Sequence, residues 1–194
     1  MKLARQKKMD EAEMLRETEK LLLDRGYEGF NFKALSLNLG IARSTIYEYY
    51  SHKDDLITDY MYILVKKVLI EMEEIASKTV GLATLQNWLK LFMTYDQVHF
   101  MISIRSQLDQ SKSTIAKSRL QEMDMLHRKM FFLLSDQVKK AKKLGEVRDE
   151  LPDTLVASFF FHSILSKPTL DTDLETWATM LNDLIENGVK PKKE

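Results

Sequence analysis

Glycine and proline, the residues that break helices, are few in this chain and fall between long stretches of helical periodicity. The 194 residues include three prolines and six glycines. Before Gly26, apolar residues recur at the spacing of one helix face, at Met14, Leu15, Leu21 and Leu22. Scarce breakers and helical spacing favour helices over strands. The sequence therefore predicts an all-α fold.

Nine helices and no strand are predicted, because each helical stretch is bounded by a breaker or a capping residue. Asn31 is a suitable N-cap for the second helix, and Gly40 ends it. Asp153 caps a later helix that Pro168 ends, and Gly188 is expected to stop the last one. The first three helices would form a small head, and the others a larger helical body. The expected ranges are residues 9–25, 32–39, 43–49, 53–78, 82–98, 100–110, 112–144, 153–166 and 173–187.

Composition excludes several classes of protein. The chain has no cysteine, which excludes disulfides, thiolate metal sites and cysteine nucleophiles. With 29 basic and 29 acidic residues its net charge is zero, unlike a protein that coats nucleic acid nonspecifically. No apolar run approaches the roughly 20 residues that span a bilayer, and the basic start leads into acidic residues rather than a signal-peptide core. We therefore expect a cytoplasmic protein with no membrane partner.

The most informative segment is residues 31–56, where two short predicted helices are separated by a tight, glycine-containing turn. The second of them, residues 43–50, is Arg-Ser-Thr-Ile-Tyr-Glu-Tyr-Tyr, so Ile46 is nearly its only apolar residue. A short helix of this kind can place its first residues against base edges in the major groove. Arg43 suits a bidentate contact to guanine, and Thr45 suits a thymine methyl or a base polar group.

Phosphate contacts are also predicted around this helix. The hydroxyls of Tyr47 and Tyr49 can reach phosphates, and Lys53 with the amides around Asp54 opens the next helix as an anion site. A helix hairpin with a merely solvated polar face fits the same residues, so their chemistry alone leaves both interpretations open. Residues 1–60 hold ten Lys or Arg and eleven Asp or Glu, a balance of −1 that weighs against DNA binding.

Residues 1–8 are basic, with Lys2, Arg5, Lys7 and Lys8 and no acid among them. One interpretation is an arm that lies along the DNA backbone or in a minor groove. The other is a solubilising tail without a partner. The sequence does not decide between the two.

A set of spacings from residue 26 to residue 56 matches a known pattern. The matching residues are Gly26-Tyr27, Leu35-Ser36, Gly40-Ile41-Ala42-Arg43-Ser44-Thr45-Ile46-Tyr47, Tyr50 and Lys53-Asp54-Asp55-Leu56. Through them residues 12–56, about a quarter of the chain, resemble the N-terminal domain of the TetR family of bacterial repressors. The resemblance implies a DNA-binding head with Leu35, Leu39 and Ile46 in its core. It also implies that the DNA-facing residues are Lys33, Arg43, Ser44, Thr45, Tyr47, Tyr49 and Lys53.

Four positions depart from the family pattern. Ala42 stands where a serine is usual, so the recognition helix lacks its common N-cap. Ser44 replaces a frequent glycine, Ser36 a small alanine, and Ser51 a proline. None of these changes removes a groove-facing position, so they bear on sequence preference rather than on the binding mode.

By the same resemblance, residues 1–52 would form the helix-turn-helix domain and residues 53–194 a helical domain for effector binding and dimerisation. Methionine and aromatic residues suit an adaptable, largely apolar effector, with an arginine or a histidine fixing one polar group. Apolar residues at helical spacing more often form an ordinary core, which is the alternative for each of them. The candidate pocket residues are Trp88, Phe92, Tyr95, Met101, Arg105, His127, Phe159 and His162.

The last two predicted helices carry large apolar residues on more than one face, which requires a second partner. In the TetR family these helices pair with their mates into a four-helix bundle. A two-fold homodimer would also present two recognition helices to successive major grooves about 34–36 Å apart. The expected interface residues are Phe159, Leu165, Trp177, Leu181 and Leu184.

Enzymatic activity, metals and cofactors are not expected. The four histidines, His52, His99, His127 and His162, lie far apart and show no metal-ligand spacing such as His-Glu-x-x-His. No glycine-rich phosphate loop is present. The basic run over residues 139–143 is expected to be a solvated helix end, favoured by the helix dipole.

The predicted function is sequence-specific regulation of transcription. The protein would be a repressor released from a palindromic, double-stranded DNA operator by a small, largely apolar effector. The alternative is a helical protein-interaction or scaffold protein that does not bind DNA.

Overall fold

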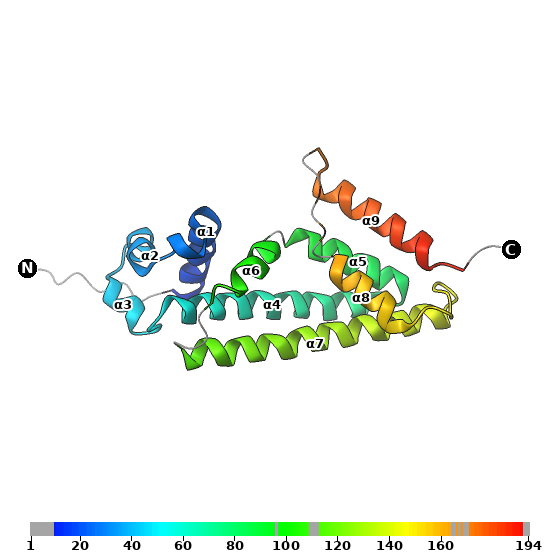
Figure 1. The fold of residues 1–194 in the computed structure, drawn as a ribbon, viewed down its shortest axis with the longest axis horizontal. Helices are drawn as coiled ribbons and strands as arrows, with labels where there is room; N and C mark the ends of the chain where they lie inside the picture. Colours follow the sequence, from blue (N-terminus) through cyan, green and yellow to red (C-terminus); the bar gives the residue numbers. More distant parts are fainter. Residues whose placement is uncertain are drawn as a thin grey trace, which may run out of the picture. The chain divides into compact units, whose positions relative to one another are not determined.

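The computed structural model describes residues 10–95, 97–108, 113–163, 166, 168 and 171–191. The basic segment 1–8, Leu165 and the side chain of His99 lie outside the described residues. Within them there are nine α-helices and no strand, which confirms the predicted all-α fold (Figure 1). The helices are α1 (Glu11–Gly29), α2 (Phe32–Leu39), α3 (Arg43–Tyr47), α4 (Lys53–Lys78), α5 (Leu82–Thr94), α6 (Gln97–Arg105), α7 (Thr114–Lys143), α8 (Asp153–Ser163) and α9 (Leu174–Val189).

Several helix ends differ from the sequence predictions. The expected stop at Gly26 is a kink inside α1, where φ is 68° and ψ is −179°, and the helix resumes to Gly29. The expected stop at Gly188 is wrong, because this residue lies within α9 and Val189 is the last helical residue. The recognition helix ends at Tyr47 and is shorter than predicted.

The helices divide into two compact units. The head unit consists of the described residues of Met1–Leu64 and Phe100–Glu122. In it α1 packs on α2 and α2 on α3, and Leu35, Leu39 and Ile46 are buried, as the resemblance implied. The functional boundary at residue 52 stays a prediction.

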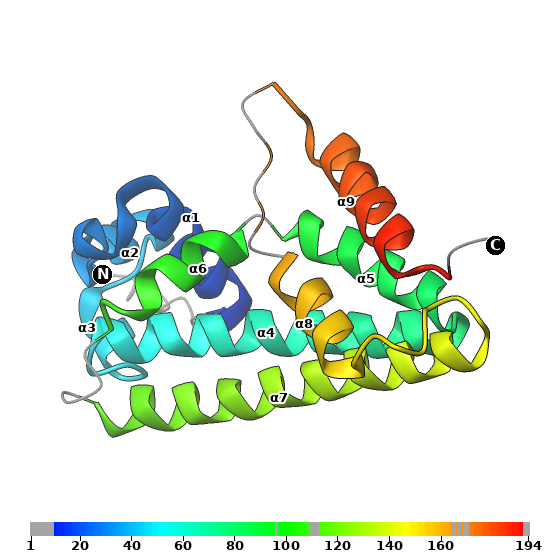
Figure 2. The same cartoon turned by 45° about the vertical axis from the view of Figure 1, so that its right-hand side comes forward.

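The body unit consists of the described residues of Val65–His99 and Met123–Glu194, and α5 packs there against α8 and α9 (Figure 2). Trp88 of α5 is fully buried, and its indole Nε1 donates to the Met72 carbonyl at 2.9 Å. The backbone amides at the start of α5 donate hydrogen bonds to side chains that are distant in the sequence. The Gly81 amide donates to Gln137 Oε1 at 2.9 Å, and the Leu82 amide donates to a Glu146 carboxylate oxygen at 2.8 Å.

Within each unit α4 and α7 lie side by side. In the head unit Arg119 of α7 pairs with Asp59 of α4, with 2.7 Å between Nε and Oδ1. In the body unit Lys129 of α7 pairs with Glu73 of α4 at 2.6 Å. Both helices continue past the residues at which the units are divided.

Candidate nucleic-acid interface

The turn between α2 and α3 is built from local signals. The Asn31 side chain caps α2 by accepting from the Ala34 amide at 2.9 Å. Gly40 then takes a left-handed conformation with φ 64° and ψ 32°. Its own amide donates to the Leu37 carbonyl at 3.3 Å, and the Ile41 amide donates to the Ser36 carbonyl at 3.1 Å. A glycine in this conformation satisfies the last carbonyls of a helix and redirects the chain.

One face of α3 is fixed in the head core and the other is exposed. Ile46 is fully buried, whereas Arg43 and Ser44 are exposed and Tyr47 is 51% exposed. The Tyr47 ring packs edge-on against Phe32 of α2, with centroids 5.2 Å apart, and the Arg43 guanidinium lies 6.0 Å from the Tyr47 ring centre. The exposed side of α3 therefore presents one guanidinium, one hydroxyl and one phenol.

The other residues of the predicted interface differ in accessibility. Lys33 on α2 is exposed, and Tyr49, which follows α3, is 54% exposed. Thr45 is only 8% exposed, so most of its surface faces the protein. Ala42 provides no side-chain cap to α3, as its type predicted.

Lys53 is engaged within the head unit. Its ammonium donates to the Tyr27 carbonyl at 2.7 Å and lies 3.9 Å from the centre of the Tyr27 ring. An ammonium over the face of an aromatic ring is attracted by the ring quadrupole. The first residue of α4 is thereby joined to the end of α1.

Two carboxylates at the start of α4 are buried against distant parts of the head unit. Asp54 accepts from the Tyr27 hydroxyl at 2.8 Å. Asp55 accepts from the His52 amide at 3.1 Å and from the Ser113 hydroxyl. In the sequence they are recognisable only as two acids at the start of a predicted helix. Their hydroxyl partners lie 27 and 58 residues away in the chain, so local periodicity contains no signal for these bonds.

A third carboxylate, Asp59, lies one turn further along α4. Its Oδ2 accepts from the Tyr50 hydroxyl at 2.8 Å, and its Oδ1 pairs with Arg119 Nε at 2.7 Å. Burial raises the pKa of Tyr50, and the hydrogen bond to the Asp59 carboxylate raises it further. The phenol therefore stays protonated and acts as a donor. Arg119 also pairs with Glu122 at 3.0 Å, and its guanidinium lies 4.6 Å from the Tyr62 ring centre.

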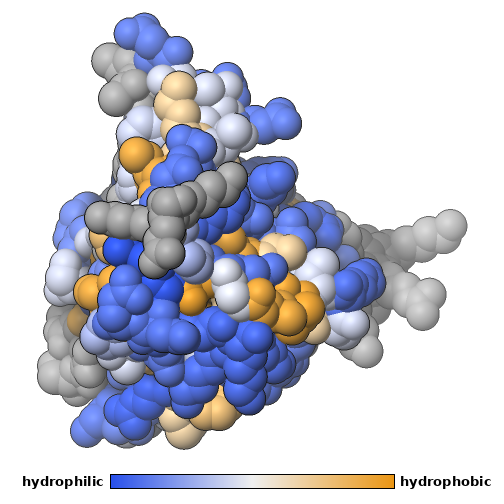
Figure 3. Space-filling model, turned by 90° about the vertical axis from the view of Figure 1, so that its right-hand side faces the viewer, coloured by the Kyte–Doolittle hydropathy of each residue, from blue (hydrophilic) through white to orange (hydrophobic). Residues whose placement is uncertain are grey.

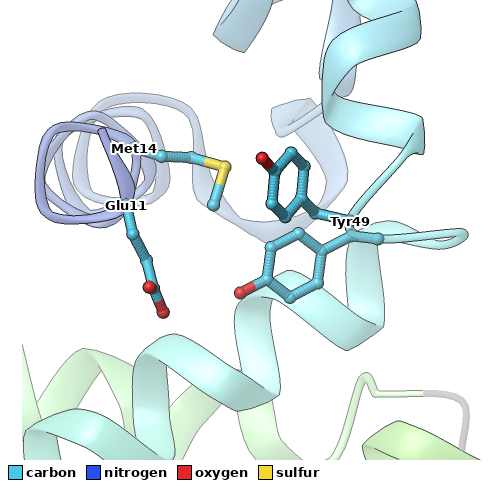
Figure 4. Close-up of a pocket in the computed structure, with 4 residues that line it drawn as sticks. Glu11, Met14 and Tyr49 are labelled. Atoms are coloured by element: carbon cyan, nitrogen blue, oxygen red, sulfur yellow. The ribbon is translucent and has the colours of Figure 1, made fainter. Parts of the chain in front are cut away.

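A cavity of about 350 Å³ lies between the start of α1 and the residues that follow α3. It is lined by Glu11, Met14, Tyr49 and Tyr50. In Figure 4 Met14 points from α1 toward the tyrosine rings. Tyr49 and Tyr50 are therefore not packed tightly on this side.

Three predicted effector residues belong to the packed core of the body unit. Trp88, Phe92 and Tyr95 are all buried. The Tyr95 hydroxyl donates to Glu71 Oε1 at 2.6 Å, and burial together with this bond raises the pKa of Tyr95. The polar atoms of Trp88 and Tyr95 thus have partners within the protein.

The remaining predicted effector residues lie in different surroundings. Met101 is buried and Arg105 is half-buried, both in the head unit. In the body unit the His127 ring packs edge-on against Phe161, with centroids 6.5 Å apart. His162 is exposed, and its Nδ1 lies 2.7 Å from the Ser158 carbonyl oxygen.

Large apolar side chains are exposed on α8 and α9. Phe159 is 62% exposed and Leu184 is 68% exposed, while Trp177 and Leu181 are half-buried. An open groove of about 360 Å³ lies beside them, lined by Leu155, Ser158, Phe159, His162, Ser163, Ser166 and Leu181. Figure 3 shows hydrophobic residues gathered in patches among hydrophilic ones on the face viewed there. The structure thus brings Phe159, His162 and Leu181 together along one apolar groove.

Neither a metal cluster nor a membrane-spanning helix is found in the described part of the chain. No group of three or more His, Asp or Glu side chains there has the arrangement of a metal site. None of the described helices combines the length and apolar character needed to cross a membrane.

Residues 14–60, which span the head helices and the start of α4, match the family model described as bacterial regulatory proteins, tetR family. No curated protein matches the chain significantly. Among solved structures, the chain is similar to the transcriptional regulator FadR from Bacillus subtilis, determined in complex with stearoyl-CoA. The TM-score is 0.71 and the identity 18%, over 93% of this chain and 100% of that one.

Two other regulators have the same fold. The ketosteroid transcriptional regulator KstR2 of Mycobacterium tuberculosis gives a TM-score of 0.71 at 13% identity, over 98% of this chain and 100% of that one. The TetR family regulator PfmR from Thermus thermophilus gives 0.72 at 18% identity, over 92% and 99% of the two chains. The chain thus matches the TetR family model in its head and shares its fold with solved TetR family regulators.

Proposed function

We propose that this protein is a sequence-specific DNA-binding repressor with α3 as its recognition helix. The observation that carries the proposal is the division of α3, in which Ile46 anchors the helix in the head while Arg43 and Ser44 remain exposed. In a helix-turn-helix, the residues at the start of the recognition helix contact base edges. Arg43 is proposed to bind guanine, and Ser44 to bind a neighbouring base.

The phosphate contacts are assigned by exposure. Tyr47, Tyr49 and Lys33 have accessible side chains and are proposed to bind phosphates beside the groove. Lys53 is proposed to add positive charge near the backbone while it stays bonded to Tyr27. Thr45, at 8% exposure, is left with a minor contact at most.

The operator-bound form is proposed to be a homodimer on a palindromic site. Exposed apolar residues on α8 and α9 support this, because a stable protein in water covers such a surface. The interface would contain Phe159, Trp177, Leu181 and Leu184, with Leu165 retained from the sequence prediction. A two-fold dimer places its recognition helices about one DNA turn apart.

The effector is proposed to be small and largely apolar. The names of two similar regulators support this, since one was determined with stearoyl-CoA and the other is a ketosteroid regulator. Trp88, Phe92 and Tyr95 of the body unit are proposed to contact it, with His127, Phe159 and His162 of the same unit as further candidates. Because the first three are buried, the effector would have to displace packed side chains. It shifts DNA binding only through a different affinity for the two states of the protein.

Selection of bound fragments from genomic DNA, followed by gel shift at physiological salt, tests the DNA-binding proposal. We expect one sequence-specific complex. Arg43→Ala should weaken it by about 1–3 kcal/mol, roughly 5- to 150-fold, and relax the preference at one base pair. Lys139→Ala removes an exposed cation of α7 and should leave the affinity for the operator unchanged.

Two results would contradict the proposal. Absence of any sequence-specific complex favours a helical interaction protein, and equal losses in both variants indicate that only net charge matters. The effector is tested on the same operator complex with long-chain acyl-CoA and ketosteroid probes. An active probe should release the DNA and raise the melting temperature of the free protein.

A further inference from the structure

The recognition segment, residues 43–52, is tied to the start of α7 by two polar bridges that both pass through α4. One bridge runs from the Tyr50 hydroxyl through Asp59 to Arg119. The other runs from the His52 amide through Asp55 to the Ser113 hydroxyl. All of these residues belong to the head unit.

The residues at the ends of the two bridges are themselves held by further hydrogen bonds. Tyr50 and His52 are among the residues that connect α3 to α4, and the Tyr50 amide also donates to the Ile46 carbonyl at 3.0 Å. Asp55 and Asp59 are four residues apart on α4, so they lie on one face of that helix. Ser113 also accepts from the Ala116 amide at 3.1 Å, so the residue that holds Asp55 caps the first turn of α7.

Burial makes these bonds costly to lose. Asp55 is 1% exposed and Asp59 is 8% exposed, and a buried carboxylate is stable only with charged or hydrogen-bonding partners. Without Arg119, the Oδ1 atom of Asp59 would lose its ion-pair partner. The carboxylate would then turn toward water, and its bond with the Tyr50 hydroxyl would change. Because a cavity lies beside Tyr49 and Tyr50, no packed side chains on that side would hold Tyr50 in place if this hydrogen bond were lost.

We propose that Arg119 is a positioning residue for DNA binding, which acts through Asp59 and Tyr50 to hold the end of the recognition segment, with Ser113 and Asp55 as the parallel support. This inference rests on the proposed DNA-binding function. It assigns the first turns of α7 to the DNA-binding machinery, although they lie more than 60 residues beyond α3 in the sequence.

The test uses the full-length protein and the operator found by selection. Arg119→Met should lower operator affinity about tenfold, a typical coupling for residues in one network. The slope of log affinity against log salt should not change, because a positioning residue neutralises no phosphate. Loss of a direct phosphate contact would reduce that slope by ~0.9. Arg119→Lys, which keeps the charge, should recover part of the affinity, and Lys117→Met, which removes an exposed cation on the same turns of α7, should have no effect.

A double-mutant cycle with Tyr50→Phe shows whether the two residues act through one bridge. The variant carrying both Tyr50→Phe and Arg119→Met should bind no more weakly than the weaker single variant. If the fold-losses in operator affinity of the two single variants multiply in the double variant, the residues act independently and the proposal is wrong.

Amide hydrogen exchange supplies a readout that needs no DNA. Arg119→Met is expected to accelerate exchange at residues 48–52 more than in the rest of the head. If this variant does not fold, Ser113→Ala is measured in its place, with the same expected result. Uniform acceleration would indicate a merely structural role and overturn the proposal. If the wild-type protein binds no operator, the proposed function fails and this inference with it. If Arg43→Ala loses binding while Arg119→Met keeps it, the positioning role alone is refuted.

Discussion

Two glycines of the body unit have opposite structural requirements. Gly81 has φ +66°, and a Cβ built on it would overlap a Glu146 carboxylate oxygen and lie 3.3 Å from the Ala141 Cα. Gly188 is helical, and a Cβ there would meet no atom within 4 Å. Gly188 was expected to stop the last helix and Gly81 lies between two predicted helices, but only Gly81 needs to be a glycine.

This difference predicts substitutions of opposite sign. Gly81→Ala should lower the free energy of unfolding by about 1–3 kcal/mol, because it forces a side chain into a backbone conformation that is nearly exclusive to glycine. It also disturbs the carboxylate that binds the Leu82 amide. Gly188→Ala should raise the free energy of unfolding by about 0.5–1 kcal/mol through helix propensity. Urea denaturation measures both, and equal effects would contradict the local geometry.

At the scale of one element, α9 depends on the residue before it. Asp173 Oδ1 accepts from the Thr176 amide at 2.9 Å and Oδ2 accepts from the Thr176 hydroxyl at 2.8 Å. These bonds, the backbone one first, lower the pKa of the Asp173 carboxyl below its usual 3.8. The cap thus stabilises the helix that carries Leu181 and Leu184 of the proposed interface.

The lowered pKa predicts a defined dependence on pH. Because the folded-state pKa lies below the unfolded one, the stabilisation is present above about pH 4 and is lost as the pH falls through the folded value. Asp173→Asn keeps a capping oxygen but does not titrate there. The difference in free energy of unfolding between wild type and Asp173→Asn, measured by urea denaturation from about pH 6 to about pH 3, should therefore shrink. A constant difference over this range would show that the charge of Asp173 does not matter.

At the scale of the whole molecule, the exposed apolar side chains of α8 and α9 are the feature that a single chain does not explain. They support the proposed homodimer, in which two heads are presented together to DNA. Affinity for a palindromic operator then depends on residues far in sequence from α3, because a lone head makes only half of the contacts.

Charged residues on this surface should separate the subunits. We expect Phe159→Asp combined with Leu181→Asp to sediment as a monomer and to lose operator binding, because a buried, unpaired carboxylate at an interface is strongly unfavourable. Phe132→Asp is the matched control, since Phe132 is 69% exposed but lies on α7. It should remain dimeric. A double variant that still sediments as a dimer would refute the proposed interface.

The candidate interface divides into residues that sequence reasoning could and could not find. Arg43, Ser44 and Tyr47 were recognisable, because a short polar helix after a glycine turn exposes its side chains in a regular way. Arg119 and Ser113 were not, because their partners lie across the fold and carry no periodic signal. The burial of Thr45 was missed for a related reason, since the polar pattern of α3 alone does not show which side meets α2.

The sequence by itself determined which segments are helical, their ends to within a few residues, and that residues 31–56 form a helix-turn-helix. Those properties follow from local forces, namely apolar periodicity, the Asn31 cap and the left-handed conformation of Gly40. Only the tertiary structure decided that three aspartates of α4 bind α1, the recognition segment and α7, and which apolar residues stay exposed. Those outcomes depend on burial and on contacts between distant segments, because a buried charge selects whatever partner the fold places beside it.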